Sequence, residues 1–326
     1  MEWVSLLAAR QTMNQKIRWG VIGSGGIARR RTIPEGIVPA SNAELVAVFD
    51  INPQANAEVA RQFNARAVDS VEALLRPDVD AVYISTPVNT HAGQTFQAAA
   101  AGKHVFCEKP LAMTVAEARN SLKTCRKAQV ILGTAFMMRY HGQHQAALEL
   151  IQEGRIGKPV YARAQLSCWY PPLPGAWRQD PKLSGGGALI DMGGHCLDLL
   201  EMFFGPVEAV SCRTHRLVHG YASEDSAVVL ASFKNGALAT VDTCFCIPDN
   251  SSKNRLELYG SKGSILAQGT IGQGEAGEMT AFLEGEDQGY NAQQARAAGG
   301  GLAITPPPAN MYRAESDRFG SLLSLG

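Results

Sequence analysis

The sequence predicts a two-domain α/β protein, with a doubly wound parallel sheet first and then an α+β domain built on a large, mostly antiparallel open sheet. In the first part of the chain, short apolar runs alternate with helix-like stretches, as in parallel sheets with right-handed crossovers. After Phe136 the pattern changes, and strand-like runs separated by short turns dominate. The length of 326 residues also exceeds what one core usually fills.

The first domain is expected at residues 16–138. Five apolar runs predict its strands, at residues 17–23, 44–50, 81–86, 104–107 and 130–136. The alanine-rich stretch from Thr90 to Ala101 predicts a helix that ends at Gly102, a residue typical of the C′ position. Thr114 and Glu117 form the pattern of a capping box and predict the start of the next helix.

The second domain is expected at residues 139–326. Helix patterns run from about Gln143 to Gly154 and from the glycines at 185–187 to Phe204. Predicted strands lie at residues 160–169, from Val207 onward, 226–233, 237–245, 255–259 and 264–268. The run Lys234-Asn235-Gly236 predicts a hairpin turn, and residues 269–301, rich in Gly, Ala and Gln, predict a loop or weakly ordered segment.

Composition excludes several classes of function. Lys plus Arg and Asp plus Glu are each 30, so the chain has no basic field for nucleic acid or an anionic membrane. No apolar run approaches the roughly 18 residues of a spanning helix. Seven scattered cysteines favour a reducing, cytoplasmic setting. Residues 1–15 predict a disordered extension rather than a signal peptide, because Glu2 stands where a positive n-region is expected.

A glycine-rich motif follows the first predicted strand. Residues 23–28, Gly-Ser-Gly-Gly-Ile-Ala, fit the G-x-G-x-x-A pattern and open a helix, which is the context that dinucleotide binding in a Rossmann fold requires. Gly23 permits the tight turn, Gly25 lets the backbone approach a pyrophosphate, and Ala28 allows close packing of helix on strand. The amides at the helix N-terminus then face the phosphates.

An acidic residue ends the second predicted strand. Asp50 lies about twenty residues past the loop, where a carboxylate binds the adenosine ribose hydroxyls. Its charge repels a 2′-phosphate, so NAD is the expected cofactor. Arginines at positions 29–31 leave NADP open, because one of them could reach a phosphate.

Three motifs, in order, resemble the glucose-fructose oxidoreductase / inositol dehydrogenase / MocA (Gfo/Idh/MocA) family. The most specific is Ala100–Ala112, AAGKHVFCEKPLA, and Thr86–His91, TPVNTH, precedes it. The third is Gly185–Gly187 leading into Asp191 and His195. The resemblance implies an NAD(P)-dependent dehydrogenase or reductase that transfers a hydride between the nicotinamide and a secondary alcohol or carbonyl of a sugar or polyol. The loop and the resemblance together assign cofactor binding to Gly23, Gly25, Gly26, Ile27, Ala28, Asp50, Thr86, Pro87, Asn89, His91, Glu108 and Lys109.

Catalysis is expected from Lys109, Asp191 and His195. Lys109 follows a predicted parallel strand, at the edge where open α/β sheets bind ligands, and a lysine there can stabilise a developing alkoxide. Asp191 and His195 are four residues apart and would share one helix face, where the carboxylate can orient the imidazole. The resemblance makes His195 the general acid/base, assisted by Asp191 and Lys109, and implies a cis peptide bond at Lys109-Pro110.

Other interpretations of the same residues stay open. One is a non-catalytic NAD(P)-binding regulator of the same fold, and another is an enzyme that uses a tightly held NAD as a transient oxidant. A zinc site would take Asp191 and His195 as two ligands, with His141 and His144, or His91 and His104, supplying the others. No motif assembles those histidines and a central lysine opposes a dication, so no metal is predicted.

Substrate and assembly are predicted more coarsely. A sugar site needs aromatic faces and bidentate donors, and Arg139, Tyr140, Trp177 and Arg178, with His195, are the candidates for the substrate wall. The apolar strands between residues 226 and 245 favour a homodimer or homotetramer through the second sheet. Relatives usually continue beyond a segment like residues 312–323, so the second domain is expected to be truncated at its C-terminal end.

Overall fold

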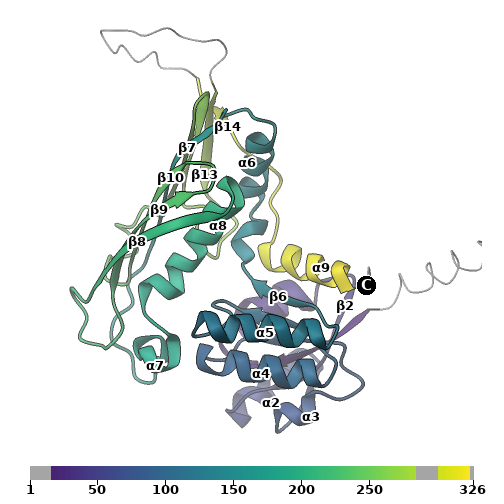
Figure 1. Cartoon of the computed structure of the whole chain (residues 1–326). Helices are drawn as coiled ribbons and strands as arrows, with labels where there is room; N and C mark the ends of the chain where they lie inside the picture. The colour runs from purple at the N-terminus through teal and green to yellow at the C-terminus, as the bar shows by residue number, and fades with distance from the viewer. Residues whose placement is uncertain (1–15, 284–299, 324–326) are drawn as a thin grey trace, which may run out of the picture. The chain divides into compact units, whose positions relative to one another are not determined.

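The computed structural model describes residues 16–283 and 300–323, which form two compact units (Figure 1). Of the described residues, the first unit contains 16–137, Lys182–Gly185 and 310–323. The second contains Met138–Pro181, 186–283 and 300–309. The extension expected at residues 1–15 lies outside the described residues.

The first unit is built on a parallel sheet of six strands in the order β3-β2-β1-β4-β5-β6. This order, with its switch between β1 and β4, is the doubly wound arrangement predicted from the sequence. The strands are β1 (Ile17–Ile22), β2 (Ala43–Phe49), β3 (Arg66–Ala67), β4 (Ala81–Ile84), β5 (His104–Glu108) and β6 (Leu132–Ala135). The helices between them are η1 (Ala28–Ile37), α2 (Pro53–Gln62), α3 (Val71–Leu74), α4 (Val88–Ala100) and α5 (Val115–Lys127).

Local signals set the ends of these helices as predicted. Thr114 accepts the N–H of Glu117, whose carboxylate accepts the N–H of Thr114, so the capping box opens α5. Gly102 follows α4 in the left-handed conformation, with φ +70°. Helix η1 is a π-helix with Pro34 inside it, and the N–H of Val38 donates to the carbonyl of Ile33, five residues back. Proline cannot donate the backbone bond that an α-helix needs there, which accounts for the wider turn.

The second unit carries an eight-stranded sheet in the order β14-β13-β12-β11-β7-β10-β9-β8. Only β7 and β10 run parallel, and the other neighbours are antiparallel. The strands are β7 (Pro159–Ser167), β8 (Val207–His215), β9 (Ser226–Phe233), β10 (Leu238–Cys244), β11 (Arg255–Gly260), β12 (Gly263–Gln268), β13 (Glu278–Leu283) and β14 (Leu302–Ala303). The helical segments are η2 (Met137–Tyr140), α6 (Gly142–Gln152), η3 (Trp177–Gln179), α7 (Pro181–Ser184), η4 (Leu189–Gly193) and α8 (Gly194–Phe204). The predicted fold class is thus confirmed in both units.

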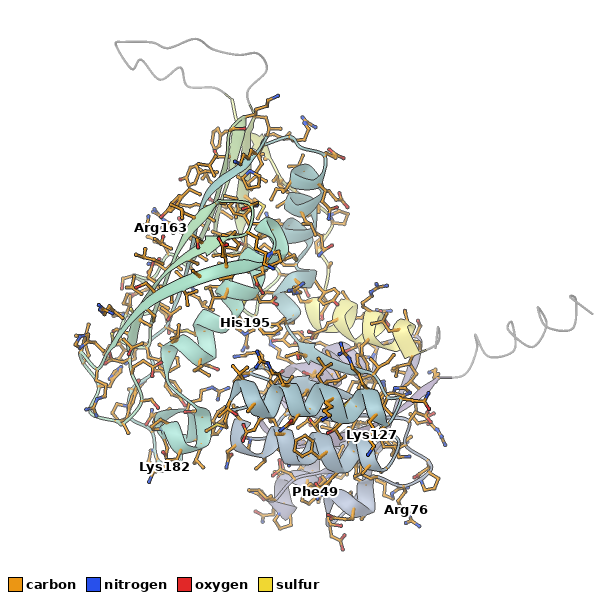
Figure 2. The ribbon with its side chains drawn as sticks, in the orientation of Figure 1. Phe49, Arg76, Lys127, Arg163, Lys182 and His195 are labelled. Carbon is orange, nitrogen blue, oxygen red and sulfur yellow. The ribbon has the colours of Figure 1, made fainter. Side chains whose placement is uncertain are left out.

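Helices cover one face of this second sheet. In Figure 1, α6 and α8 lie on the same side of it. Along β7, Ala162 and Ala164 are buried while Arg163 between them is exposed, and Figure 2 labels Arg163 on the side away from α8. The outer face of the sheet is therefore partly open, and it exposes the apolar side chains of Val228, Leu230 and Leu238.

Two expectations about the C-terminal half need revision. Residues 269–301 were expected to form a loop, but β13 occupies 278–283, pairs with β12 and alternates buried and exposed side chains. Residues 284–299 lie outside the described residues, and β14 follows the end of the predicted loop. Helix α9 (Met311–Leu323), expected in the second domain, instead packs on η1 of the first unit. The ring of Phe319 stacks on Phe106 with centroids 4.8 Å apart, so this helix also contacts β5 of the first unit.

Candidate active site

The glycine-rich loop between β1 and η1 has the geometry of a phosphate cradle. Gly23 has φ +84°, and a Cβ there would lie 2.9 Å from Thr86 Cγ2 and from the backbone of Ser85, so only glycine fits. Gly26 has φ +49°, and a Cβ on it would meet no heavy atom within 4 Å. The buried Ala28 then starts η1 against the sheet. A tight turn that leaves open space beside its backbone fits the pyrophosphate of a dinucleotide.

Asp50 lies directly at this loop. Its Oδ2 accepts the N–H of Gly25 at 2.9 Å, and its Oδ1 accepts the N–H of Asn52 at 2.9 Å. The carboxylate therefore reaches the loop from the end of β2, which is where the sequence places the ribose-binding acid.

The three arginines after the loop have partners within their own unit. Arg29 pairs with Glu58 at 2.9 Å, and Arg31 pairs with Glu35 at 2.6 Å. Arg30 Nε donates to the carbonyl of Gly26 at 3.2 Å. Since each guanidinium has an acceptor, these arginines give weaker support to a 2′-phosphate site than the sequence alone allows.

The turns after β4 and β5 hold the remaining predicted cofactor residues. Thr86 Oγ1 donates to Gln94 Oε1 at 2.6 Å, Pro87 occupies the N-cap position of α4, and Asn89 is exposed on the first turn of that helix. Lys109 directly follows β5, and the peptide before Pro110 is cis, which confirms that expectation. The fully buried His91 is held between two backbone carbonyls rather than presented to solvent.

In the second unit, Asp191 and His195 lie on consecutive helices and not on one regular α-helix. Asp191 belongs to the π-helical turn η4 and His195 to the first turn of α8, where Figure 2 labels it. His195 is buried, with 6% of its surface exposed. A π turn spaces side chains more widely than the predicted α-helix, and such single turns are common at functional sites.

Glu224, which the sequence did not single out, holds the start of this segment. Its carboxylate accepts the N–H of Gly187 at 2.7 Å and of Leu189 at 3.1 Å. A Cβ on Gly187 would lie far inside contact distance of the Glu224 carbonyl oxygen, so glycine is required there. No local pattern could have identified Glu224, because its partners are more than thirty residues away.

The short helix η3, which carries Trp177 and Arg178, supplies a partner for Asp191. Arg178 Nε lies 3.2 Å from Asp191 Oδ1, and the Arg178 guanidinium lies over the Trp177 ring at 4.3 Å. The nearby Cys168 thiol is no nucleophile, because burial and then the charge of Asp191 raise its pKa to about 12. The structure thus groups two predicted substrate residues with one predicted catalytic residue.

Arg139, a predicted substrate residue, makes a bidentate ion pair with Asp198. Its Nε and Nη2 donate to the two carboxylate oxygens at 2.7 Å each. That pair explains Arg139 as a structural contact between η2 and α8. A substrate role for Arg139, and for the half-buried Tyr140 beside it, stays a prediction.

Within residues 16–283 and 300–323, no group of three or more His, Cys, Asp or Glu side chains is placed to hold a metal ion. No helix within the same segments has the length and apolarity to cross a membrane.

A cradle for a dinucleotide at the switch point of a doubly wound sheet, followed by a second sheet domain, defines the class of nicotinamide-dependent oxidoreductases. A family model described as an oxidoreductase family with an NAD-binding Rossmann fold matches residues 17–136, and the GFO/IDH/MocA C-terminal domain matches residues 144–266. The chain belongs to the Gfo/Idh/MocA oxidoreductase family, and a nicotinamide dinucleotide is its cofactor.

Similar proteins agree with this assignment. The chain is 36% identical over 276 residues to a 1,5-anhydro-D-fructose reductase of Ensifer adhaerens, covering 83% of this chain and 82% of that one. It is 33% identical over 264 residues to a myo-inositol 2-dehydrogenase of Thermotoga maritima, covering 77% and 75%. Among solved structures, an aldose-aldose oxidoreductase of Caulobacter crescentus complexed with glycerol matches with a TM-score of 0.83 at 25% identity, covering 96% and 90%.

Proposed function

We propose that this protein interconverts a secondary alcohol and a carbonyl on a sugar or polyol, with NAD as the hydride carrier. The observation that carries the proposal is the position of Lys109, directly after β5 in the sheet whose β1 ends at the dinucleotide loop. Ligands of open α/β sheets bind at these carboxyl ends of strands. Relatives named as a sugar reductase and an inositol dehydrogenase support the substrate class.

In this proposal, His195 is the general acid/base. Its imidazole accepts the proton of the substrate hydroxyl when the alcohol is oxidised and returns it when the carbonyl is reduced. Lys109 places positive charge at the substrate oxygen, and Asp191 balances the charge that His195 gains. The ion pair between Arg178 and Asp191 fixes the carboxylate beside the proposed substrate wall.

We also infer a preference for NAD over NADP. The Asp50 carboxylate stands at the loop, where it would bind ribose hydroxyls and repel a 2′-phosphate. The partners of Arg29, Arg30 and Arg31 support the same preference.

We infer the cellular compartment from the cysteines and the oligomeric state from exposed apolar side chains. All seven cysteines are free thiols, which fits a reducing cytoplasm. The exposed Val228, Leu230 and Leu238 favour self-association through the second sheet. Sedimentation tests the latter: a dimer or tetramer is expected, and a strictly monomeric species would reject it.

The function is tested with a panel of polyols, aldoses and their keto derivatives, read at the nicotinamide absorbance with NAD(H) and NADP(H). Turnover of at least one sugar or polyol, faster with NAD(H), is expected. Binding of NADH with no turnover of any substrate would contradict the proposal and favour a regulator. Nucleotide that co-purifies and is reduced and reoxidised without net use of added NAD would favour the enzyme with tightly held NAD.

A further inference from the structure

The backbone at Lys109 is held by two buried side chains to which the proposed reaction assigns no step. Tyr83, in the middle of β4, is fully buried, and His91, in the first turn of α4, is 1% exposed. Each of them makes a hydrogen bond that ends next to Lys109. Buried polar groups are retained with full hydrogen bonding, and here that bonding converges on one turn.

Tyr83 acts through Glu108. The Tyr83 hydroxyl donates to Glu108 Oε1 at 2.5 Å, and Glu108 Oε2 accepts the N–H of Lys109 at 3.1 Å. The Thr32 hydroxyl, on η1, donates to the Tyr83 oxygen at 2.9 Å. A carboxylate pinned at both oxygens fixes the amide that begins Lys109, and it connects this amide to the helix that follows the dinucleotide loop.

His91 acts through Pro110. Its Nδ1 lies 2.9 Å from the carbonyl oxygen of Pro110, and its Nε2 lies 2.9 Å from the carbonyl oxygen of Thr86. The imidazole therefore joins the turn after β5 to the turn after β4. Both partners can only accept, so a neutral ring donates to one of them and the protonated ring donates to both.

The charges that face His91 are those of Glu108 and Lys109. Burial lowers the pKa of His91, and the two carbonyls and Glu108 oppose that effect. The neutral ring is therefore the form near pH 7, and one of its two carbonyl contacts carries the single donated hydrogen bond.

We propose that Tyr83 and His91 are positioning residues for Lys109. Tyr83 holds the Lys109 amide through Glu108, and His91 holds the carbonyl of Pro110, the next residue. This inference rests on the proposed function, in which the Lys109 ammonium must meet the substrate oxygen. Misplacing a reacting group by about 1 Å costs on the order of 100-fold in rate. Losing either hold is expected to lower the rate of turnover without removing the cofactor.

A pair of substitutions at His91 separates positioning from mere packing. An Asn amide nitrogen takes roughly the place of Nδ1 and keeps a donor for Pro110, whereas a Gln amide nitrogen takes the place of Nε2 and keeps a donor for Thr86. We expect kcat of His91→Gln to be at least fivefold lower than kcat of His91→Asn. Equal losses in the two variants would overturn the role of His91.

Tyr83→Phe removes only the hydroxyl. It is expected to lower kcat at least tenfold while KM and the Kd for NADH change less than threefold. Tyr161→Phe is the matched control, since the Tyr161 hydroxyl bonds Thr240 at 2.7 Å in the second unit. His104→Gln is a second control, which shows whether changing a hydrogen bond of β5 lowers kcat when that bond is far from Lys109. His104 Nδ1 accepts the N–H of Ile131 at the opposite end of β5. A kcat of Tyr83→Phe within twofold of the wild type would overturn the role of Tyr83.

Amide hydrogen exchange tests the same inference without any turnover. In the full chain, the segment containing the Lys109 amide is expected to exchange at least tenfold faster in Tyr83→Phe than in the wild type and in Tyr161→Phe. If Tyr83→Phe is too unstable to measure, Thr32→Val, which removes the hydroxyl that bonds Tyr83, replaces it with the same expectation. Unchanged exchange would overturn the inference even if the enzyme proves active. Faster exchange in a protein that turns over no substrate would leave the positioning intact and reject the proposed function.

Discussion

Helix α9 is expected to stabilise the nucleotide-binding unit chiefly through one ring. Phe319 is 4% exposed, and its ring stacks on Phe106 at 4.8 Å and lies 5.5 Å from the ring of Trp19. A Cβ on Gly133 would lie 2.8 Å from this ring, so the ring sits directly on the β6 backbone. Phe319→Ala should empty a space that its rigid neighbours cannot fill.

The size of the effect follows from the burial. Truncating a buried Phe to Ala costs about 3–5 kcal/mol, and a unit of this size loses roughly 2–4 °C in Tm for each kcal/mol. The unit's Tm should therefore fall by about 6–20 °C in calorimetry, and NADH should raise it again by binding the folded state. Leu322→Ala, at a 37% exposed position of the same helix, is the control and should cost less than about 1 kcal/mol. Equal losses of stability in the two variants would show that the Phe319 ring is not the main stabilising contact of α9.

Three further predictions concern single side chains. Burial holds the pKa of His144 near 3, below its usual 6.5, so its contribution to stability is complete above pH 6.5 and is lost as pH falls toward 3. At pH 5 this lowers the free energy of unfolding by about 2 kcal/mol relative to neutral pH. In urea unfolding measured as a function of pH, His144→Gln should remove this decrease, whereas the exposed His215→Gln should retain it. Asp50→Ser should weaken NADH binding about tenfold and shift the NADH/NADPH preference toward NADPH in fluorescence titrations, and an unchanged preference would contradict the ribose role. Glu224→Gln should cost about 1–3 kcal/mol in urea unfolding, because one of two backbone N–H groups loses its acceptor, and a cost no larger than that of the exposed Glu208→Gln would count against it.

Local patterns explain most of what the sequence could predict. The turn at Gly23, the capping box at Thr114 and the hairpin turn at Gly236 each depend on residues adjacent in the chain, and each appears in the structure. The cis peptide before Pro110 was also correct, although it came from the family resemblance and not from the residues alone.

Long-range contacts explain what the sequence could not predict. Strand β13 lies in a glycine-rich segment and shows its alternation over only six residues, so pairing with β12 decides its structure. Helix α9 packs on the first unit through contacts such as the stack of Phe319 on Phe106, and residue spacing along the chain does not predict such a contact. Sequence motifs likewise do not predict two long-range hydrogen-bond sets, those of Glu224 to residues 187 and 189 and that of Tyr83 to Glu108.

We propose that Lys109 and His195 carry out the chemistry of a nicotinamide-dependent alcohol–carbonyl enzyme. The most direct test is kcat/KM of Lys109→Met and His195→Gln at saturating NAD, with the exposed His215→Gln as control and the Kd for NADH measured on each protein. We expect losses of about 10²–10⁴-fold in both variants, with the NADH affinity of His195→Gln within about threefold of the wild type and the control unchanged. Turnover within twofold of the wild type in either variant would contradict it.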